Sequence, residues 1–298
     1  MTHKGSSLYR GYALFLLPGV LAFLVLILFP FLANIGLSFT KWSGVGKPVW
    51  IGLANYERAI SDSSFWASFK NNLLLIVAMT IIPTIVGLFL AAFLFDYIAD
   101  KFGQGVASIF RAGFYLPQII PLVVAGIVWR WIYQPQWGAL NGLLRFLGLD
   151  SLARPWLGDH STAMYAVMGM MVWFQIGYPL VIFMAALQRI DPELYEAAAL
   201  DGASWLQKFF RITIHLIRPE IAVVVLTTAI HALKIFAPIY SMTRGGPGKA
   251  TIVASYFSYQ NFFERSNVGY GATIATILTL IIVLLTIGFI LAQTRREE

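Results

Sequence analysis

The apolar stretches of this chain constrain its fold more than any other feature. Six stretches, residues 12–37, 73–95, 109–133, 163–187, 221–242 and 270–293, are almost free of charged side chains. A helix needs about 20 mostly apolar residues to cross the hydrocarbon core of a bilayer, and each stretch is long enough. A strand of a membrane barrel instead alternates apolar and polar residues over about ten positions. The pattern therefore predicts an all-α, polytopic membrane protein with about six transmembrane helices.

Composition supports the same class. Hydrophobic residues make up 58% of the 298 residues and charged residues only 12%, whereas a soluble domain carries about 25% charged residues. We therefore expect one transmembrane domain over 12–293, between a short N-terminal segment (1–11) and a short tail (294–298). The first stretch is longer than the apolar core of a signal peptide, which predicts a retained span.

The charge pattern excludes several functions. The net charge is +7, but Lys and Arg are spread over short connectors, which favours contact with lipid headgroups over binding of nucleic acid. The chain has no cysteine and therefore no disulfide framework or thiolate nucleophile. An even number of spans places both termini on one side of the membrane. Ten basic residues fall on each side of the membrane, if Arg111 and Arg130 near the two ends of the third stretch are counted with the sides that they adjoin, so the basic-residue rule leaves the orientation open.

The connector between the fourth and fifth stretches, residues 189–219, has explicit local signals. Asp191 is a good N-cap for a short helix, and Gly202 can adopt the left-handed conformation that ends it. Ser204, followed three residues later by Gln207, has the spacing of a capping box that opens a second helix. The sequence therefore predicts a helix, a turn and a helix.

The second helix of this hairpin is amphipathic. Its apolar residues recur at helical spacing, and they are Trp205, Phe209, Ile212 and Leu216. Lys208 and Arg211 fall on the other face. From the residues alone, the hairpin is either an amphipathic surface connector or a docking element for another chain.

Several motifs resemble a known family. The hairpin contains Glu196-Ala197-Ala198, Asp201-Gly202-Ala203 and Phe209, which resemble the EAA loop of binding-protein-dependent ATP-binding-cassette (ABC) permeases of the maltose-type carbohydrate branch. The segments Thr243-Arg244-Gly245-Gly246-Pro247 and Gly52-Leu53-Ala54-Asn55-Tyr56 resemble segments of the same permeases. His215 departs from the pattern, because many relatives have proline there.

The resemblance implies a function and an orientation. It implies the transmembrane domain of a type I ABC importer, in the plasma (inner) membrane of a bacterium or archaeon. In that family the short helix is a coupling helix that enters a groove of a cytoplasmic ATPase, so the loop and both termini would be cytoplasmic. The implied partners are a second homologous permease, two ATP-binding subunits, an extracytoplasmic solute-binding protein, membrane lipid and a sugar or polyol substrate. No cofactor is expected.

Candidate residues of a substrate path lie in the fourth and fifth stretches. An ionisable side chain within a span usually faces a bundle interior or a water-filled path, which singles out Lys234. Thr227, His231, Pro238 and Ser241 share its helix face. In the fourth stretch Pro179 removes a hydrogen bond to Gln175, close to Trp173 and Tyr178. The alternatives are that Lys234 extends to the interface or pairs with a partner permease, and that the prolines only bend packed helices.

The chain itself is not expected to be an enzyme. Its Gly-Lys pairs at 46–47 and 248–249 lack the rest of a phosphate-binding loop, and its four histidines are dispersed, which predicts no metal site. ATP hydrolysis is therefore expected on partner subunits. The alternatives are a permease for glycerol-3-phosphate or another phosphorylated polyol, a secondary transporter, and a membrane enzyme with a site that the sequence does not reveal.

Overall fold

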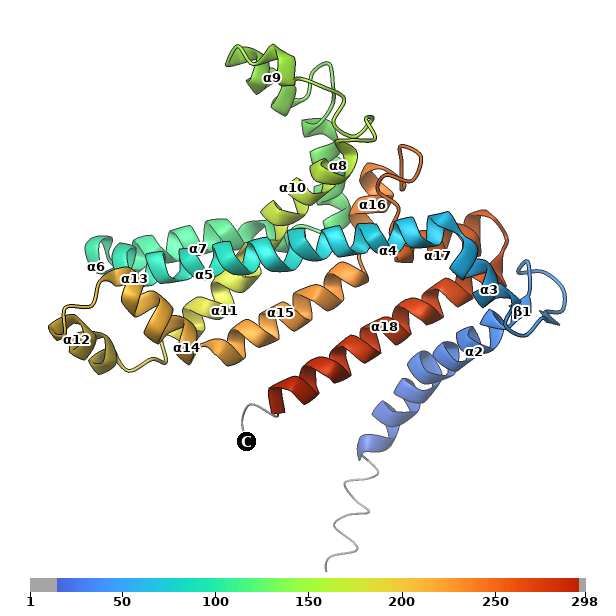
Figure 1. Ribbon diagram of the computed structural model, residues 1–298, viewed down its shortest axis with the longest axis horizontal. Helices are drawn as coiled ribbons and strands as arrows, with labels where there is room; N and C mark the ends of the chain where they lie inside the picture. Colours follow the sequence, from blue (N-terminus) through green and yellow to red (C-terminus); the bar gives the residue numbers. More distant parts are fainter. Residues whose placement is uncertain (1–14, 295–298) are drawn as a thin grey trace, which may run out of the picture. The chain divides into compact units, whose positions relative to one another are not determined.

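The computed structural model describes residues 15–294, which form two compact units (Figure 1). The first unit holds residues up to 62 together with 258–280, and the second holds 63–257 together with the end of the chain from 281. The predicted segment 1–11, and all but the first residue of the predicted tail 294–298, lie outside the described residues. Among the described residues, strands are confined to one short pair, as the all-α prediction required.

The first unit contains one long helix from each end of the chain and a short connector. Its elements are the helix over Phe15–Ser38, which includes η1 (Leu24–Leu28) and α2 (Phe29–Ser38), the strands β1 (Thr40–Lys41) and β2 (Val49–Trp50), α3 (Ala54–Ser61), η6 (Gln260–Glu264) and the first part of α18 (Val268–Thr294). The two strands pair antiparallel, with Thr40 opposite Trp50.

A buried amide joins the parts of the first unit. Asn55 donates from Nδ2 to the carbonyl oxygens of Ser38 and Thr40, both at 2.9 Å. The Ser38 carbonyl also accepts from Thr273 Oγ1 at 3.0 Å. Gly269 leaves room for this contact, because a Cβ there would lie 1.8 Å from the Thr40 carbonyl oxygen. The end of α2 is thereby fixed to the start of α18.

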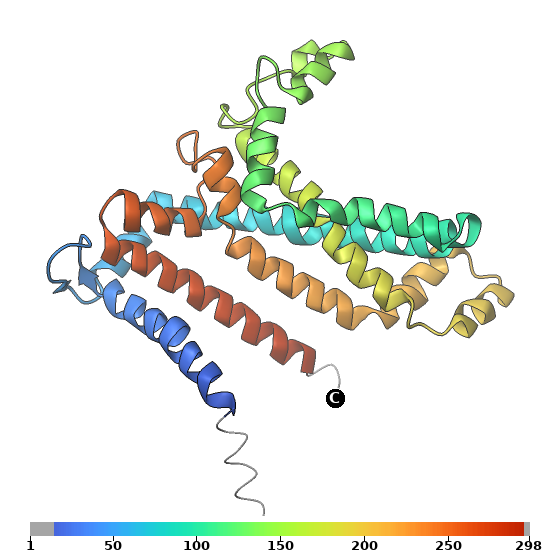
Figure 2. The same ribbon diagram turned by 180° about the vertical axis from the view of Figure 1, so that it is seen from behind.

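The second unit contains the remaining elements. They are α4 (Ser63–Ile76), η2 (Val77–Ile81), α5 (Ile82–Phe93), η3 (Leu94–Ile98), α6 (Ala99–Phe102), α7 (Gln104–Ile119), α8 (Leu122–Ile132), α9 (Ala139–Phe146), η4 (Asp150–Leu152), α10 (Ala163–Gln175), α11 (Gly177–Leu187), α12 (Pro192–Leu200), α13 (Trp205–Lys208), η5 (Phe209–Thr213), α14 (Ile214–Leu216), α15 (Arg218–Leu233), α16 (Ala237–Met242) and most of α17 (Ala254–Tyr259). Figures 1 and 2 show α12 and α13 at one end of this unit and α8 and α16 at the other.

The described helices match the expected spans in number but not in continuity. Four helices are long and apolar enough to cross a membrane: Phe15–Ser38, Ser63–Ile98, Ala163–Leu187 and Val268–Gln293. The second begins ten residues earlier than the stretch 73–95 that the sequence indicates. Two bent pairs raise the number to six if each pair is one span.

Both remaining stretches are interrupted. The stretch 109–133 is divided between α7 and α8, which meet at 97°. Pro121 stands at this corner, where it cannot donate a backbone hydrogen bond and disfavours a helical residue before it. The stretch 221–242 is divided at Lys234–Phe236 between α15 and α16. The hairpin helix before α15 meets it at 71°. The interruption after Leu233 lies just before Pro238, one of the two prolines that the sequence analysis singles out in the predicted path.

The break after α15 is held by one buried side chain. Asn72 is fully buried and donates from Nδ2 to the carbonyl oxygens of Ala232 at 3.0 Å and Leu233 at 3.1 Å. Its Oδ1 accepts from the backbone N–H of Ala254 at 3.0 Å. These carbonyls belong to the last turn of a helix, where the usual donors four residues later are missing. The Ala232 carbonyl also accepts from the Ile235 N–H at 3.4 Å. The amide therefore replaces the hydrogen bonds that the break removes.

The core of the second unit lies where α5, α11 and α15 pack together. Its largest fully buried side chains include Leu180, Phe183 and Leu187 of α11. A close approach of α7 to α11 is possible because residue 177 is glycine. A Cβ at Gly177 would lie 2.4 Å from the Phe114 carbonyl oxygen and 2.7 Å from the Tyr115 Cα.

We predict that Gly177→Ala destabilises the protein, because both close atoms belong to the α7 backbone and cannot rotate away. Overpacking of this kind costs about 1–3 kcal/mol. The measurement is thermal unfolding of the purified protein in detergent. Gly113→Ala is the matched control in α7, since a Cβ there would meet no atom within 4 Å. Equal melting temperatures for the two variants would contradict the prediction.

Candidate functional site

The hairpin between α11 and α15 has the local structure that the sequence predicts. Asp191 caps α12 by accepting from the Glu193 backbone N–H at 3.0 Å. Gly202 ends the turn with a φ of 78°, in the left-handed region. Ser204 and Gln207 exchange both hydrogen bonds of a capping box at the start of α13. The predicted helix, turn and helix are confirmed.

The first arm of the hairpin is exposed. No residue of α12 is buried, and the Leu200 side chain is 90% exposed. Glu196, Ala197 and Asp201 are also exposed, whereas Ala198 and Ala203 are half-buried. The exposed leucine follows three small alanine residues, so this arm has a partly apolar surface with few bulky side chains.

The second arm is anchored to the end of the second span. Phe209 is buried and stacks on Trp205 with ring centroids 5.3 Å apart. Phe89 of α5 meets both rings edge-on. The Trp205 Nε1 donates to Asp96 Oδ2 at 2.9 Å. An aromatic cluster around the buried Phe209 ring, with a charge-assisted hydrogen bond, therefore fixes this arm to α5 and η3.

Two further contacts close the hairpin. The hydroxyls of Tyr195 and Thr213 share a hydrogen bond of 2.9 Å, which joins the two arms. Burial raises the pKa of Tyr195 above its usual value, so the phenol stays protonated. At the base, Arg189 forms an ion pair with Glu220 in the first turn of α15. The ion pair is exposed on the Arg189 side and adds little stability, but it links the two ends of the hairpin.

A cavity of about 510 Å³ lies at the breaks in the fourth and fifth predicted spans. Its lining residues are Met79, Gln118, Leu122, Met171, Phe174, Gln175, Tyr178, Thr227, His231, Lys234, Ile235, Phe236 and Ala237. Four of the five predicted path residues are therefore brought together, namely Gln175, Tyr178, His231 and Lys234. They come from the end of α10, the start of α11 and the end of α15.

Hydrogen bonds position the polar side chains of this cavity. Tyr178 and Thr227 share a hydrogen bond of 3.2 Å between α11 and α15. Gln118 donates from Nε2 to the Phe174 carbonyl at 2.8 Å and to Gln175 Oε1 at 3.4 Å. The lining thus offers hydroxyl and amide groups beside aromatic rings, which suits a ligand rich in hydroxyls.

Among the described residues, the lining of this cavity contains basic side chains and no acidic ones. Lys234 and His231 have exposed side chains on its wall. None of the described residues that line it carries a carboxylate. Across residues 15–294, no cluster of three or more His, Asp or Glu could hold a metal ion. The cavity therefore suits a neutral or anionic ligand.

The fifth predicted path residue, Trp173, lies elsewhere, and so does Ser241, which was expected on the helix face of Lys234. Trp173 lies outside this cavity, in an apolar groove with Phe110 and Phe114, and packs against Trp129 at 5.4 Å between ring centroids. Ser241 also lies outside, because the break after Leu233 ends the helix face that it would have shared. It contacts α8 instead, where a Cβ on Gly126 would lie 2.0 Å from the Ser241 Oγ.

Gln118 is the polar lining residue that the sequence analysis missed. It lies in the last turn of α7, one residue after Pro117 and three before Pro121. Paired prolines around an amide within an apolar stretch are the signal that could have found it, because they predict a break in the helix.

Comparison with known proteins shows the family of the chain. Residues 85–297 match the family described as "Binding-protein-dependent transport system inner membrane component". The chain belongs to this family. It is 39% identical to "Probable ABC transporter permease protein YurN" of Bacillus subtilis (strain 168), over 96% of this chain and 97% of that protein. It is also 32% identical to "Trehalose/maltose transport system permease protein MalF" of Thermococcus litoralis, over 92% of this chain and 90% of that protein.

Solved structures show the same fold. A chain of a bacterial ABC transporter that imports the acidic polysaccharide alginate superposes with a TM-score of 0.83 at 23% identity. The match covers 97% of this permease and 98% of that chain. A second crystal structure, of a bacterial alginate ABC transporter with an alginate-bound periplasmic protein, gives a TM-score of 0.81 at 21% identity, covering 95% and 94%. The permease therefore has the fold of an ABC importer transmembrane subunit.

We predict that Lys234→Met lowers or alters uptake without affecting assembly, because the ammonium group faces the cavity and not the helix packing. The measurement is substrate uptake into proteoliposomes, beside the yield of the assembled complex. Lys70→Met is the matched control, since Lys70 is an exposed lysine of α4 that does not line the cavity. Uptake kinetics identical to those of the unmodified permease would remove Lys234 from the path.

Proposed function

We propose that this permease forms half of the translocation path for a sugar or polyol in an ABC importer of the plasma membrane. It pairs with a second, homologous permease, and two separate ATPase subunits drive it through the hairpin. An extracytoplasmic binding protein delivers the substrate. The hairpin and both termini are cytoplasmic. No catalytic step occurs on this chain.

One observation carries this proposal: the cavity and the hairpin lie at opposite ends of the same two helices. Helix α11 has Tyr178 in its first turn and ends two residues before Arg189. Helix α15 starts beside the hairpin and has His231 in its last turn. The rise of about 1.5 Å per residue separates the ends of an 11-residue helix by about 16 Å.

Displacement of the hairpin therefore moves both walls of the cavity. The two helices are joined near the cavity by the hydrogen bond between Tyr178 and Thr227. Near the hairpin they are joined by the ion pair of Arg189 with Glu220. A closing motion of the ATPases would thus reach the cavity through rigid elements and open it alternately to the two sides of the membrane.

The two arms of the hairpin suit this transmission. Exposed α12 offers a surface for a groove on another protein, with Leu200 as its most exposed apolar side chain. The second arm is held by the hydrogen bond between Trp205 and Asp96 and by the Phe209 ring. A force applied to the first arm would then reach the helices instead of being lost in a mobile loop.

The choice of a sugar or polyol rests on the cavity lining and on the relatives. Aromatic rings beside amide and hydroxyl groups are the chemistry that recognises a hydroxyl-rich molecule. The names of the relatives include transport systems for trehalose and maltose and for starch degradation products. The related crystal structure is of an alginate importer.

A phosphorylated polyol such as glycerol-3-phosphate is the second candidate. Lys234 and His231 line a cavity whose described lining includes no carboxylate, which would suit a phosphate group. Competition of glycerol-3-phosphate and of a neutral sugar for uptake separates the two candidates. A secondary transporter is separated from both by the energy source, because only an ABC importer takes up substrate in proportion to ATP hydrolysis by a copurifying subunit.

We predict that Gly202→Pro uncouples transport from ATP hydrolysis. Proline fixes φ near −65°, whereas Gly202 has a φ of 78°, and the substitution also removes the hydrogen bond from its N–H to Ala199. The misfit costs about 3 kcal/mol or more and is confined to the turn. In reconstituted complexes, we expect basal ATPase activity to persist while uptake per ATP falls sharply.

Gly202→Asn is the control for this variant, because asparagine tolerates the left-handed conformation. It should retain most of the coupled uptake. Normal uptake by Gly202→Pro would show that the turn does not transmit force.

A further inference from the structure

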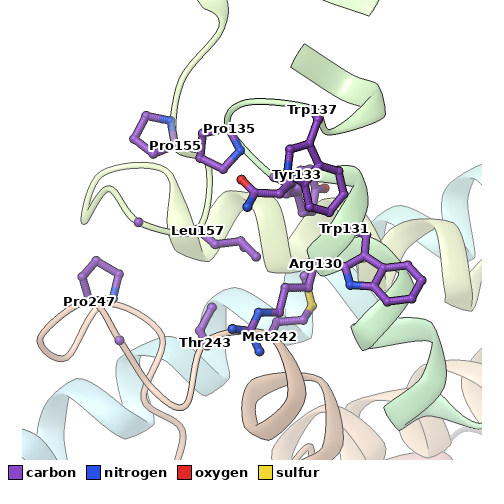
Figure 3. Close-up of a pocket in the computed structure, with 13 residues that line it drawn as sticks. Arg130, Trp131, Tyr133, Pro135, Trp137, Pro155, Leu157, Met242, Thr243 and Pro247 are labelled. Atoms are coloured by element: carbon purple, nitrogen blue, oxygen red, sulfur yellow. The ribbon is translucent and has the colours of Figure 1, made fainter. Parts of the chain in front are cut away.

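A second cavity, of about 610 Å³, lies at the other ends of α8 and α16 (Figure 3). It is lined by Arg130, Trp131, Tyr133, Gln134, Pro135, Trp137, Pro155, Leu157, Gly158, Met242, Thr243, Gly246 and Pro247. Figure 3 shows Tyr133 and Trp137 at one edge and Thr243 and Pro247 at the other, with the Arg130 side chain reaching toward Thr243. None of the path residues predicted from the sequence lines it.

One wall of this cavity is a turn held by side chains. The turn, residues 134–137, closes through a hydrogen bond of 2.9 Å from the Gly138 N–H to the Gln134 carbonyl. Arg145 donates to the Pro135 and Gln136 carbonyls, both at 2.9 Å. Gly138 permits the tight turn, since a Cβ there would lie 2.3 Å from the Gln134 carbonyl oxygen. The wall is therefore rigid before any ligand binds.

The opposite wall is equally constrained. Thr251 is fully buried, and its hydroxyl donates to the Gly246 carbonyl at 2.9 Å. The same hydroxyl shares a hydrogen bond of 2.7 Å with Thr243. Its backbone N–H donates to the Gly245 carbonyl at 3.2 Å. These hydrogen bonds from Thr251 hold the loop 242–247, so its atoms that line the cavity stay in place.

One polar atom of the lining lacks a partner. The Gln134 Oε1 is buried, and no hydrogen-bond donor among the described residues reaches it. Leaving a buried acceptor unpaired is costly, so such atoms are rare in folded proteins and call for an explanation. If the Gln134 side chain turns so that this oxygen faces the cavity, a hydroxyl of a bound molecule would supply the missing donor.

The other groups of the lining match the same kind of ligand. The Trp137 side chain is 67% exposed and presents an indole face at the edge of the cavity. Arg130 supplies a guanidinium with several N–H donors. The described lining includes no carboxylate to neutralise that guanidinium.

We propose that this second cavity is an additional sugar-binding site, on the extracytoplasmic side of the path. A sugar ring lies against Trp137, and the Arg130 guanidinium donates to oxygens of the sugar. The Gln134 side chain turns toward the ligand, and one sugar hydroxyl donates to its Oε1. The proposal rests on the proposed function for its substrate class and orientation. It adds a residence point for the sugar between the binding protein and the cavity at Lys234.

The two cavities share two helices, which supports a relay between them. We call the cavity at Lys234 the inner cavity and the second cavity the outer cavity. Helix α8 lines the inner cavity at Leu122 and the outer cavity at Arg130. These residues are separated by about 12 Å along the axis at about 1.5 Å per residue. Helix α16 likewise contributes Ala237 to the inner cavity and Met242 to the outer one. A sugar released from the outer site can therefore move along both helices to the inner site.

The test uses the natural absence of cysteine from the chain. Leu157→Cys places one thiol in the lining of the outer cavity, and Leu147→Cys places one at an exposed position outside it. The whole importer, with its partner subunits but without ATP, is treated with a water-soluble maleimide. Maltotriose is the neutral probe and a mannuronate trisaccharide is the acidic probe.

We predict that one probe protects the thiol at position 157 but not the thiol at position 147. At a probe concentration of about ten times Kd, modification should slow by about tenfold. Adding Trp137→Ala should raise the probe concentration needed for protection by up to about tenfold, whereas Trp66→Ala, at a tryptophan outside the cavity, should not change it. Protection by the neutral probe or by the acidic probe decides which sugar class the outer site takes.

Gln134→Leu separates binding from a structural role. It removes an unpaired buried acceptor, so the free permease should be as stable as before or more stable. If the amide binds sugar, protection should weaken by about three- to tenfold. Unchanged protection in this variant and in Trp137→Ala would overturn the proposal.

The two proposals fail in different ways. Protection is measured without ATP, so absence of protection by either probe overturns the outer site even in an importer that takes up sugar normally. Absence of ATP-driven uptake of any sugar contradicts the proposed function itself.

Discussion

The contact on which the candidate site most depends is that of the Asn72 side chain with the end of α15. In hydrocarbon a helix can be interrupted only where its freed backbone groups find partners. The buried amide donates to the Ala232 and Leu233 carbonyls and accepts from the Ala254 N–H, so the chain can leave the helix at Lys234 and begin again as α16. Without this break, Lys234 would lie on a continuous helix face. The residues of the interruption, Lys234–Phe236, all line the inner cavity.

The sequence predicts this fold well wherever the signals are local. Apolar length alone indicates where the helices lie, and caps such as Asp191 and Ser204 define the hairpin to the residue. The corners at Pro121 and after Leu233 are harder to predict from the sequence. A proline shows where a helix can break, but it does not show whether the helix breaks there. The partner that stabilises the second break is Asn72, which is 160 residues from Ala232 in the chain. No local pattern reveals such a pair.

The same limit applies to the candidate site. Helical spacing and proline positions identify Tyr178, His231 and Lys234 from the sequence. These signals succeed because all three residues lie within one turn of a helix break. Trp173 is near Gln175 in sequence, but two residues along a helix point to different faces, and it packs outside the inner cavity. Gln118 enters the lining only because α7 and α8 meet at a sharp corner, which composition does not predict.

The near-contact of Gly126 with Ser241 determines how the two cavities can respond to a driving force. The Ser241 side chain fills the space over Gly126, so α8 and α16 pack tightly there and a large shift of one helix would displace the other. Under the proposed function, the pair acts as a single lever with one cavity at each end. A tilt that widens the space beneath it must change the space above it at the same moment, which makes simultaneous opening to both sides of the membrane mechanically difficult.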